Sequence, residues 1–416
     1  MSTESFGGND LFMLDNKKKV LLIHRYFYPD SPPYALILED MRQILSKQGY
    51  HVDVLSSQPS YKSIDKTKKI PFKTIASDGS IIYRLPVFRL NNTKIEKILN
   101  YFWFPIITFI FLLAHKKYHI ITVSTAPQIF LAFFVSLITK LKKNKLIYHC
   151  MDIHPEIGRL SGEFKNKIIY YFLKKIDMIT CKTASAIIVL SSDMKKALID
   201  RAKYLEDKIF IINNYDISTK EIAPDSFFQE NSSKKRIIYA GNIGRYQHLD
   251  SFILALREYG CIENIELIFV GEGHALNQLK HLAAPIKNCV RFIPHQSLSI
   301  ARKIISEADM CIVSLQEGVI KYAYPSKTMT YLAEGIPILA CVEKKSELAQ
   351  FITTENLGIV VDHSEREEIY NFFKQLSQNN LSYRKEHIQN VFNKTFSKKQ
   401  FEKKFTCLIL TLMEEK

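Results

Sequence analysis

The chain has 416 residues, of which 47% are hydrophobic and 24% are charged, and its formal net charge is +15. This composition excludes a disordered or fibrous protein and suffices for two domains with cores of their own. The surplus of Lys and Arg favours anionic partners, such as phosphorylated substrates or an anionic membrane. No helix-turn-helix, zinc-finger or RNP pattern is present, so we do not expect nucleic acid as a partner.

The N-terminus and the cysteines support two further predictions. Residues 1–18 are mostly polar, and we expect a flexible N-terminus without a signal peptide. The seven cysteines are scattered, form no C-x-x-C pair and show no metal-ligand spacing. We therefore expect free, mostly buried thiols in a reducing cytoplasm, and no metal site.

Residues 19–213 alternate apolar runs with helix-like segments. A run at 19–24, a helix at about 34–48 and a run at 51–56 form a strand–helix–strand unit, which requires parallel pairing. The same sheet is expected to continue through runs at 82–85, 120–123, 145–149, 186–190 and 209–212.

A polar stretch at 213–236 separates a second series of the same kind. Strands are expected at 236–240, 265–270, 290–293, 309–315 and 336–342, with helices at about 248–258, 275–283, 297–306 and 326–334. Two such series predict two Rossmann-like α/β domains facing a cleft, with ligands at the carboxyl ends of the strands. We place the second domain at 214–382 and a helical tail at 383–416.

The stretch 98–114 holds 17 residues without a charge and is flanked by basic residues. A spanning helix needs about 20 apolar residues, and Pro105 interrupts this one. A shorter apolar run at 129–138 ends in a lysine-rich segment at 140–145. Three alternatives remain open: helices docked on an anionic membrane surface, which we favour, buried core helices, or a true span.

Three titratable residues follow the strand at 145–149. Asp152, His154 and Glu156 lie within five positions of one another, where acid–base groups would face the cleft. We predict a catalytic role for them, with Asp152 as the first choice. The alternative is an Asp that caps a helix beside solvated surface groups.

Two loops of the second domain predict phosphate binding. Gly241 and Gly244 allow the backbone to approach a ligand closely, and Arg245 could pair with a diphosphate. Lys327 is a cation at the start of a predicted helix, where free N–H groups also attract phosphate. The alternatives are ordinary glycine turns and a plain helix capped by Ser326.

The segment PSKTMTYLAEGIPILA at 325–340 resembles the donor-site signature of family 4 glycosyltransferases with the GT-B fold. It is most similar to the branch that builds bacterial surface polysaccharides. YAGNIG at 239–244, VGEG at 270–273, FIPH at 292–295 and DIHPE at 152–156 resemble further motifs of the family, in family order. The likeness extends over nearly the whole chain from about residue 19.

This resemblance implies a GT-B fold whose C-terminal helix crosses back to the N-terminal domain. It implies that 19–213 bind the acceptor and 214–382 bind a nucleoside diphosphate sugar, without a metal or other cofactor. The donor-binding residues it implies are Gly241, Asn242, Gly244, Arg245, Gly271, Glu272, Gly273, His295, Pro325, Ser326, Lys327 and Thr330.

The chain departs from the family pattern at the two positions where relatives carry paired glutamates. These positions are occupied by Tyr322 and Thr330. Glu317, in the same loop, is a candidate substitute for one of the missing acids. Pro32 and Pro33 also stand where relatives often have glycine, which stiffens the first loop of the N-terminal domain.

Together these features predict a retaining glycosyltransferase of hexosyl or N-acetylhexosaminyl type in bacterial surface polysaccharide synthesis. The expected acceptor is a glycan linked to a lipid diphosphate. The expected location is the cytoplasm, with peripheral attachment to the inner face of the plasma membrane. One alternative is a non-catalytic GT-B protein that binds a nucleotide-sugar or a partner enzyme. Another is a nucleotide-sugar epimerase of similar architecture.

Overall fold

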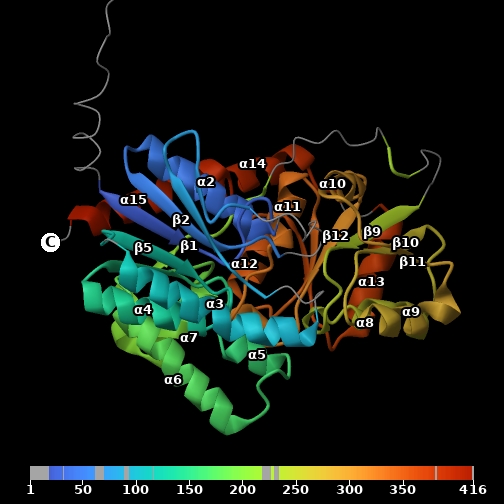
Figure 1. The fold of residues 1–416 in the computed structure, drawn as a ribbon. Helices are drawn as coiled ribbons and strands as arrows, with labels where there is room; N and C mark the ends of the chain where they lie inside the picture. The colour runs from blue at the N-terminus through green and yellow to red at the C-terminus, as the bar shows by residue number, and fades with distance from the viewer. Residues whose placement is uncertain are drawn as a thin grey trace, which may run out of the picture.

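The computed structural model describes residues 18–30, 32–60, 70–88, 93–115, 117–217, 226–228, 234–379 and 382–414. These residues form two α/β domains that lie side by side, each with a parallel sheet covered by helices (Figure 1). The predicted flexible N-terminus falls outside the described residues, apart from Lys18. Much of the predicted linker at 213–236 also falls outside them.

The N-terminal sheet has the strand order β3-β4-β2-β1-β5-β6-β7-β8. Its strands are β1 (Lys19–Ile23), β2 (His51–Ser57), β3 (Lys73–Ile75), β4 (Ile81–Leu85), β5 (Ile120–Ser124), β6 (Lys145–His149), β7 (Ala186–Val189) and β8 (Ile209–Ile211). The pairs are parallel except β3 with β4, which the sequence analysis did not predict as a hairpin. The central strands are apolar and buried on both faces, as parallel strands between helix layers must be.

The C-terminal sheet has the order β11-β10-β9-β12-β13-β14, all parallel. Its strands are β9 (Lys235–Ala240), β10 (Ile265–Val270), β11 (Val290–Ile293), β12 (Met310–Ser314), β13 (Ile338–Cys341) and β14 (Gly358–Val361). The order reverses between β9 and β12, which places the ligand-binding crevice at the carboxyl ends of these two strands. The predicted strands are confirmed to within a few residues at each end, and β14 was not predicted.

Helices cover both sheets. In the N-terminal domain they are α2 (Pro33–Lys47), α3 (Lys94–Ala114), α4 (Phe130–Lys142), α5 (Glu156–Leu160), α6 (Lys167–Thr183) and α7 (Ser192–Arg201). In the second domain they are α8 (Asp250–Tyr259), α9 (Leu276–Ala283), α10 (Leu298–Ser306), α11 (Lys327–Ala333), α12 (Glu347–Thr354) and α13 (Arg366–Ser377). Polar caps fix several starts: the Thr93 hydroxyl accepts from Glu96 N at 3.1 Å, and Ser191 caps α7.

The tail consists of α14 (Lys385–Thr395), which packs on α11, and α15 (Lys398–Glu414), which packs on α2 of the first domain. The Lys398 ammonium pairs with Asp40 at 2.6 Å, and the Phe401 ring contacts Tyr215. Figure 1 shows α15 beside α2 and β1, far from the second sheet. The predicted return of the C-terminal helix to the N-terminal domain is confirmed.

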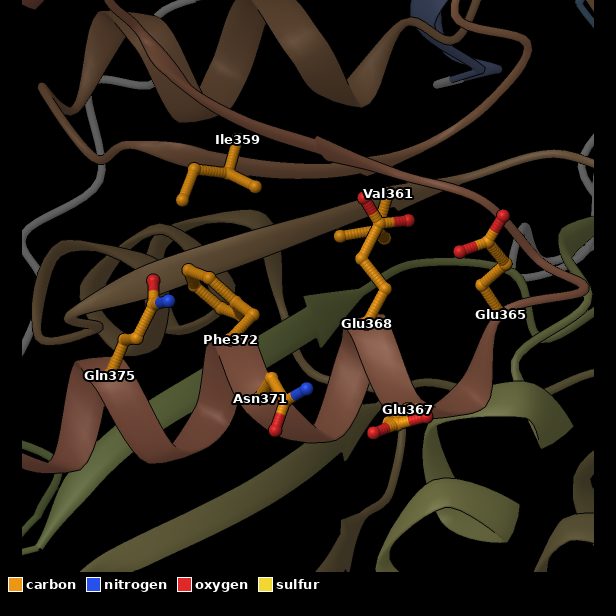
Figure 2. A pocket seen from close by; sticks show the side chains of 8 residues that line it. All are labelled: Ile359, Val361, Glu365, Glu367, Glu368, Asn371, Phe372 and Gln375. Carbon is orange, nitrogen blue, oxygen red and sulfur yellow. The ribbon is translucent and has the colours of Figure 1, made fainter.

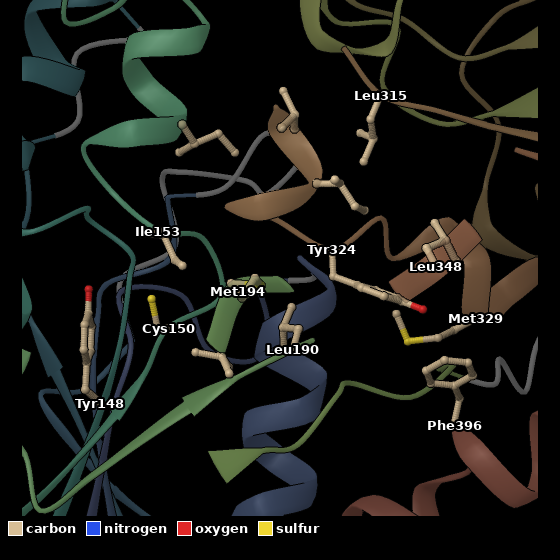
Figure 3. Close-up of a cluster of buried hydrophobic side chains, with 14 of the residues drawn as sticks. Tyr148, Cys150, Ile153, Leu190, Met194, Leu315, Tyr324, Met329, Leu348 and Phe396 are labelled. Carbon is tan, nitrogen blue, oxygen red and sulfur yellow. The ribbon is translucent and has the colours of Figure 1, made fainter. Parts of the chain in front are cut away.

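One apolar cluster joins the two domains. Figure 3 shows Ile153 and Leu190 of the first domain in one group with Tyr324, Met329 and Leu348 of the second. All are less than a tenth exposed. Because this cluster lies between the sheets, burial of apolar surface holds the domains together beside the cleft.

The expectation of free thiols is wrong for one pair of cysteines. Cys261 and Cys289 form a disulfide at the starts of the neighbouring strands β10 and β11. Their positions, 28 residues apart, gave no recognisable spacing, and sheet pairing brings them together. Cys150, Cys181 and Cys311 are buried free thiols, as predicted.

Candidate active site

A pocket of about 280 Å³ lies at the carboxyl ends of the strands where the domains meet. Both domains contribute to its wall, as the predicted cleft requires. The polar and aromatic lining residues are Gln128, Asp152, His154, Glu163, Tyr239, Tyr246, Gln247, Ser314, Tyr324, Ser326 and Lys327. Among the predicted site residues, Asp152, His154, Pro325, Ser326 and Lys327 line this pocket.

Lys327 enters the pocket over the turn that follows β9. Its ammonium lies 4.9 Å from the centre of the Tyr239 ring, a cation–π contact. Gly241 has a φ of +136°, which residues with a side chain rarely adopt, and a Cβ there would lie 2.4 Å from Lys327 Cε, so the glycine also leaves room for the lysine. Removal of water around the ammonium lowers the pKa of Lys327 to about 8. Such a cation is ready to gain an anionic ligand.

The glycines after β10 support this turn. A Cβ on Gly271 would meet the Gly241 carbonyl at 2.1 Å, and one on Gly273 would meet the Ile243 carbonyl at 2.1 Å. The backbones are also linked, because Ile243 N donates to Glu272 O at 2.8 Å. The motif at 270–273 therefore has a structural role: it brings one loop against the next.

The loop after β6 carries Asp152 into the pocket from the opposite domain. Ile153 N donates to Tyr322 O at 2.7 Å, and Asp152 pairs with Ala323 in a single β-bridge. These contacts tie the loop to the segment before α11. Asp152 and Lys327 thus line one pocket through segments that are hydrogen-bonded across the domain boundary.

Burial sets the charge states in this loop. It raises the pKa of Asp152 to about 6, because a carboxylate loses hydration there. It lowers the pKa of His154 to about 4 and that of His149 to about 3, so both imidazoles are neutral at pH 7. His154 Nδ1 is buried without a hydrogen-bond partner among the described residues. Of Asp152, His149 and His154, Asp152 is thus the residue whose charge changes nearest neutral pH.

Glu156 does not line the pocket. Its carboxylate is 7% exposed and is held by Arg201 of α7 and by Lys174 of α6. The sequence placed Glu156 beside Asp152 and His154, but the start of α5 turns it to the opposite side of the loop. The geometry therefore gives no support to its predicted catalytic role and assigns it to a buried ion-pair cluster.

Several predicted donor residues lie outside the pocket lining. Arg245 and His295 are exposed, and Asn242, Gly244 and Thr330 are not among the lining residues. The alternative, a plain helix capped by Ser326, is not supported, since the Ser326 side chain makes no capping hydrogen bond. Helix α11 has seven residues, so the Lys327 side chain carries the case for phosphate binding here, rather than the helix terminus.

Tyr322 and Thr330, the two positions that lack the family glutamates, are not among the residues that line the pocket. The Tyr322 backbone carbonyl accepts the hydrogen bond from Ile153 N, and burial, together with the nearby Glu156 carboxylate, raises the pKa of the Tyr322 hydroxyl. Glu317, the proposed substitute, is exposed and does not line the pocket. The carboxylates that line the pocket are Asp152 and Glu163, both of the N-terminal domain, so the lining residues of the C-terminal domain include none in place of the missing pair.

Gln128, Glu163 and Gln247 line the pocket and were not predicted. Gln128 follows β5, so the rule that sites gather at the carboxyl ends of strands could have found it. The Gln247 carbonyl accepts from Ser314 Oγ, and its side-chain Oε1 is buried without a partner among the described residues. Glu163 comes after α5 in a polar turn, where the sequence gives no such signal.

A second hollow, of about 380 Å³, lies between β14 and α13 in the C-terminal domain (Figure 2). Its wall carries Glu365, Glu367 and Glu368, and no Lys or Arg is among its lining residues. Such a surface would repel a diphosphate. We therefore assign the donor to the pocket with Lys327.

The described residues contain no group of three or more His, Cys, Asp or Glu arranged to hold a metal ion. Helix α3 is the one described helix that is long and apolar enough to cross a membrane, and a third of its apolar window is buried in the fold.

The fold and the pocket define a two-domain α/β protein of GT-B architecture. Residues 37–215 match the family model described as Glycosyltransferase Family 4, and residues 311–407 match the one described as Glucosyltransferase 3-like, C-terminal domain. Residues 37–215 therefore form a Glycosyltransferase Family 4 domain, in agreement with the family that the motifs predict.

Two curated relatives are similar to this chain. The probable glycosyltransferase WbjE of Pseudomonas aeruginosa is 24% identical over 272 residues, which are 64% of this chain and 68% of the relative. The putative colanic acid biosynthesis glycosyl transferase WcaI of Escherichia coli K12 is 23% identical over 357 residues, 81% of this chain and 86% of the relative.

A solved structure shares the fold over nearly the whole chain. HepE of Anabaena in complex with UDP-glucose superposes with a TM-score of 0.64 at 13% identity, covering 94% of this chain and 99% of that one. The similarity confirms the predicted GT-B fold.

Proposed function

We propose that this protein transfers a sugar from a nucleoside diphosphate sugar to a lipid-diphosphate-linked glycan in the synthesis of a bacterial surface polysaccharide. The observation that carries the proposal is the Lys327 ammonium, desolvated beside the Gly241 turn and lining one pocket with Asp152 of the other domain. A diphosphate leaving group gains negative charge in the transition state, and a fixed cation stabilises that charge.

The donor side of the proposal draws on the relatives. HepE binds UDP-glucose in the same fold, so a uridine nucleotide is our first choice, with a hexosyl or N-acetylhexosaminyl sugar. The name of WcaI refers to the synthesis of a polysaccharide, which supports the same pathway class here. Retention of anomeric configuration follows from the family resemblance. No metal or other cofactor is part of the proposal.

A thermal-shift experiment tests the donor site. We expect UDP at millimolar concentration, with EDTA present, to raise the unfolding midpoint by several degrees, because a ligand that binds the native state stabilises it. GDP, ADP and CMP should produce smaller shifts. If none of the four nucleotides stabilises the protein, the proposed donor site is rejected.

The alternative is a non-catalytic GT-B protein that binds a nucleotide-sugar or a partner enzyme. The observation in its favour is that Tyr322 and Thr330 occupy the positions of the paired glutamates. Both functions predict nucleotide binding, so turnover separates them. Transfer of a radiolabelled sugar to a polyprenyl-diphosphate-linked acceptor supports the enzyme, and binding without transfer supports the alternative. Turnover without an acceptor would indicate an epimerase.

We also propose that the N-terminal domain docks on the inner face of the plasma membrane. Helix α4 packs between α3 and α6, and the three helices lie on one side of the domain (Figure 1). Helix α3 turns a buried face with Asn100 and Phe104 toward the fold. Its opposite face, together with α6, is apolar and exposed: Ile98, Phe102, Ile106, Ile110, Ile168, Ile169 and Phe172 are 40% to 80% exposed.

Because α3 has one buried and one exposed face, we favour an interfacial helix over a true span. Lysines border this surface, but they do not all face outward. Lys142 donates to the carbonyls of Leu112 and His115 at the end of α3, and Lys145 donates to Leu412 O. Lys140 and Lys143 are exposed and remain as contacts for anionic lipid.

Replacing Lys140 and Lys143 by glutamine should weaken binding to anionic phosphatidylglycerol vesicles. Each basic residue near such a surface contributes about 1 kcal/mol, so we expect roughly 30-fold weaker binding at low salt. Replacing the exposed Ile98 and Ile110 by serine should weaken binding in high salt as well. Vesicle flotation measures both.

The matched control for the vesicle experiment replaces Lys280 and Lys287 by glutamine. These lysines are exposed on the C-terminal domain, so the same change of charge should leave vesicle binding unaltered. Equal losses in both lysine pairs would mean that net charge alone attracts the protein, and the docking surface would be rejected. Resistance of the wild-type protein to alkaline extraction would instead indicate a spanning helix.

A further inference from the structure

We infer that Arg201 is a positioning residue for the proposed transfer reaction, because it fixes the loop that carries Asp152 and His154. Arg201 is the last residue of α7, and its side chain is 3% exposed. This inference rests on the proposed function, since it concerns the rate of the chemical step in that pocket. No motif of the sequence pointed to this residue.

The guanidinium binds the loop at two successive points. Nη2 donates to the carbonyl oxygen of His154 at 2.7 Å. Nε donates to Glu156 Oε1 at 3.0 Å, and Nη2 also contacts the other oxygen of the same carboxylate. The planar fork of arginine can engage a carboxylate in this way while it holds a backbone carbonyl.

A third contact anchors the arginine itself. Nη1 donates to Asp177 of α6 at 2.5 Å, and the Tyr148 hydroxyl donates to the other Asp177 oxygen at 2.9 Å. The Lys174 ammonium completes the cluster, 3.3 Å from Glu156. The negative charges of Glu156 and Asp177 are thus balanced by the positive charges of Arg201 and Lys174. A buried ion-pair cluster is stable only when its charges are paired in this way.

The charge states agree with this geometry. Burial would lower the pKa of Arg201, but Asp177 and Glu156 outweigh burial and raise it. Arg201 therefore stays charged at any working pH, and it cannot act as an acid or base itself. Burial keeps the pKa of Asp177 above its usual value, although Arg201 opposes this effect.

The loop is consequently held from both sides. Arg201 binds it at His154 and Glu156, and Tyr322 of the other domain binds it at Ile153. Asp152 directly precedes Ile153 and His154 directly follows it, and both residues line the pocket. A misplacement of about 1 Å at a reacting group is enough to reduce a rate by about 100-fold. Arg201 thus acts on the reaction through the position of Asp152.

The test compares Arg201→Lys with Asp177→Asn in the full-length protein. Lysine keeps the positive charge but lacks the planar guanidinium, so it cannot hold the His154 carbonyl and the Glu156 carboxylate together. Asp177→Asn weakens the same ion-pair cluster but leaves the hydrogen bonds of Arg201 to His154 and Glu156 in place. We expect Arg201→Lys to lower kcat 10- to 100-fold, with KM for the UDP-sugar and Kd for UDP within threefold. Asp177→Asn should keep kcat within threefold, even where it lowers the unfolding midpoint as much.

Lys174→Gln serves as the charge control, because Lys174 contacts Glu156 and not the His154 carbonyl. It should leave kcat unchanged. A kcat for Arg201→Lys at the wild-type level overturns the inference. The inference is also overturned if kcat falls in proportion to the unfolding midpoint in both Arg201→Lys and Asp177→Asn. Such a result would mean that Arg201 has a purely structural role.

If Arg201→Lys does not fold, the triple variant Arg201→Met, Glu156→Gln, Asp177→Leu replaces it. Apolar replacement of a buried ion-pair cluster often preserves stability, while the His154 carbonyl still loses its donor. The same loss of kcat supports the inference, and wild-type kcat overturns it. Should the wild-type protein show no turnover, the proposed function fails. Hydrogen exchange at residues 152–156 then decides whether Arg201→Lys frees the loop and Asp177→Asn does not.

Discussion

Replacement of Lys327 by methionine is expected to weaken UDP binding roughly 30- to 100-fold. A hydrogen bond to a charged group contributes about 2 to 3 kcal/mol when its partner is buried, and a diphosphate in this pocket would lose that partner. The lysine lies over Tyr239 beside Gly241, and among the described residues it forms no ion pair with a carboxylate. Isothermal titration calorimetry with UDP measures the loss directly.

The same replacement should raise the stability of the unliganded protein. Burial lowers the pKa of Lys327 from 10.5 to about 8, so the folded state disfavours the charged form. That penalty, up to about 3 kcal/mol, is fully present below pH 8 and disappears as pH rises toward 10.5. Lys327→Met therefore removes it at pH 7. A variant that binds UDP less well but unfolds at a higher temperature would show that the lysine is kept for binding.

The pH dependence of binding provides an internal check. The diphosphate binds the ammonium, so the affinity of the wild-type protein should fall as pH rises above about 8, and that of Lys327→Met should not. Lys321→Met is the matched control, because Lys321 is exposed six positions upstream and does not line the pocket. Unchanged UDP affinity in Lys327→Met would exclude the phosphate role.

The parts of the fold that the sequence predicted are those set by local pattern. Apolar runs such as 120–123 and 265–270 became central strands because a parallel strand between helix layers is buried on both faces. Short β3 has little apolar surface, with two of its three residues exposed, and the pattern therefore missed it. The disulfide between Cys261 and Cys289 depends on sheet order, which the spacing of cysteines does not contain.

The residues of the candidate site also fall into two groups: those that a local sequence pattern indicates, and those whose position depends on the fold. Asp152 and Lys327 were predicted because each follows a strand of a parallel sheet, where ligand sites gather. Glu156 was assigned to the pocket on sequence proximity, but the turn into α5 directs it to Arg201, 45 residues further along the chain. An ion pair of this separation leaves no local signal. The glycines at 271 and 273 were predicted from their motif to contact the donor; that they also allow one backbone loop to approach another could be seen only in the fold.

The pocket brings Asp152 of one domain together with Lys327 of the other. The hydrogen bond from Ile153 N to Tyr322 O and the β-bridge between Asp152 and Ala323 connect the loop of Asp152 to the segment that leads to Lys327. Tyr322 occupies the place of a family glutamate, and its backbone, not its side chain, makes this contact. The position can therefore vary in side chain while the link between the domains persists.

Replacement of Asp152 by asparagine is expected to lower kcat about 1000-fold, the middle of the range for an acid–base group, with UDP affinity within twofold of wild type. The side chain keeps its shape, and the loop bonds of Ile153 and His154 do not involve the carboxylate. The effect should thus fall on the chemical step. Transfer assays at saturating UDP-sugar, together with UDP calorimetry, separate the two quantities.

The pH dependence of kcat identifies the group whose ionisation controls the rate. Burial raises the pKa of Asp152 to about 6, so a reaction that needs the carboxylate should accelerate as pH rises through 6 and level off above 7. Asp152→Asn should lose this limb. His154→Gln is the control: burial lowers the pKa of His154 to about 4, so the rise in rate near pH 6 should remain in this variant. If the rise near pH 6 persists in Asp152→Asn, it belongs to another residue, and Asp152 is excluded as the catalytic group.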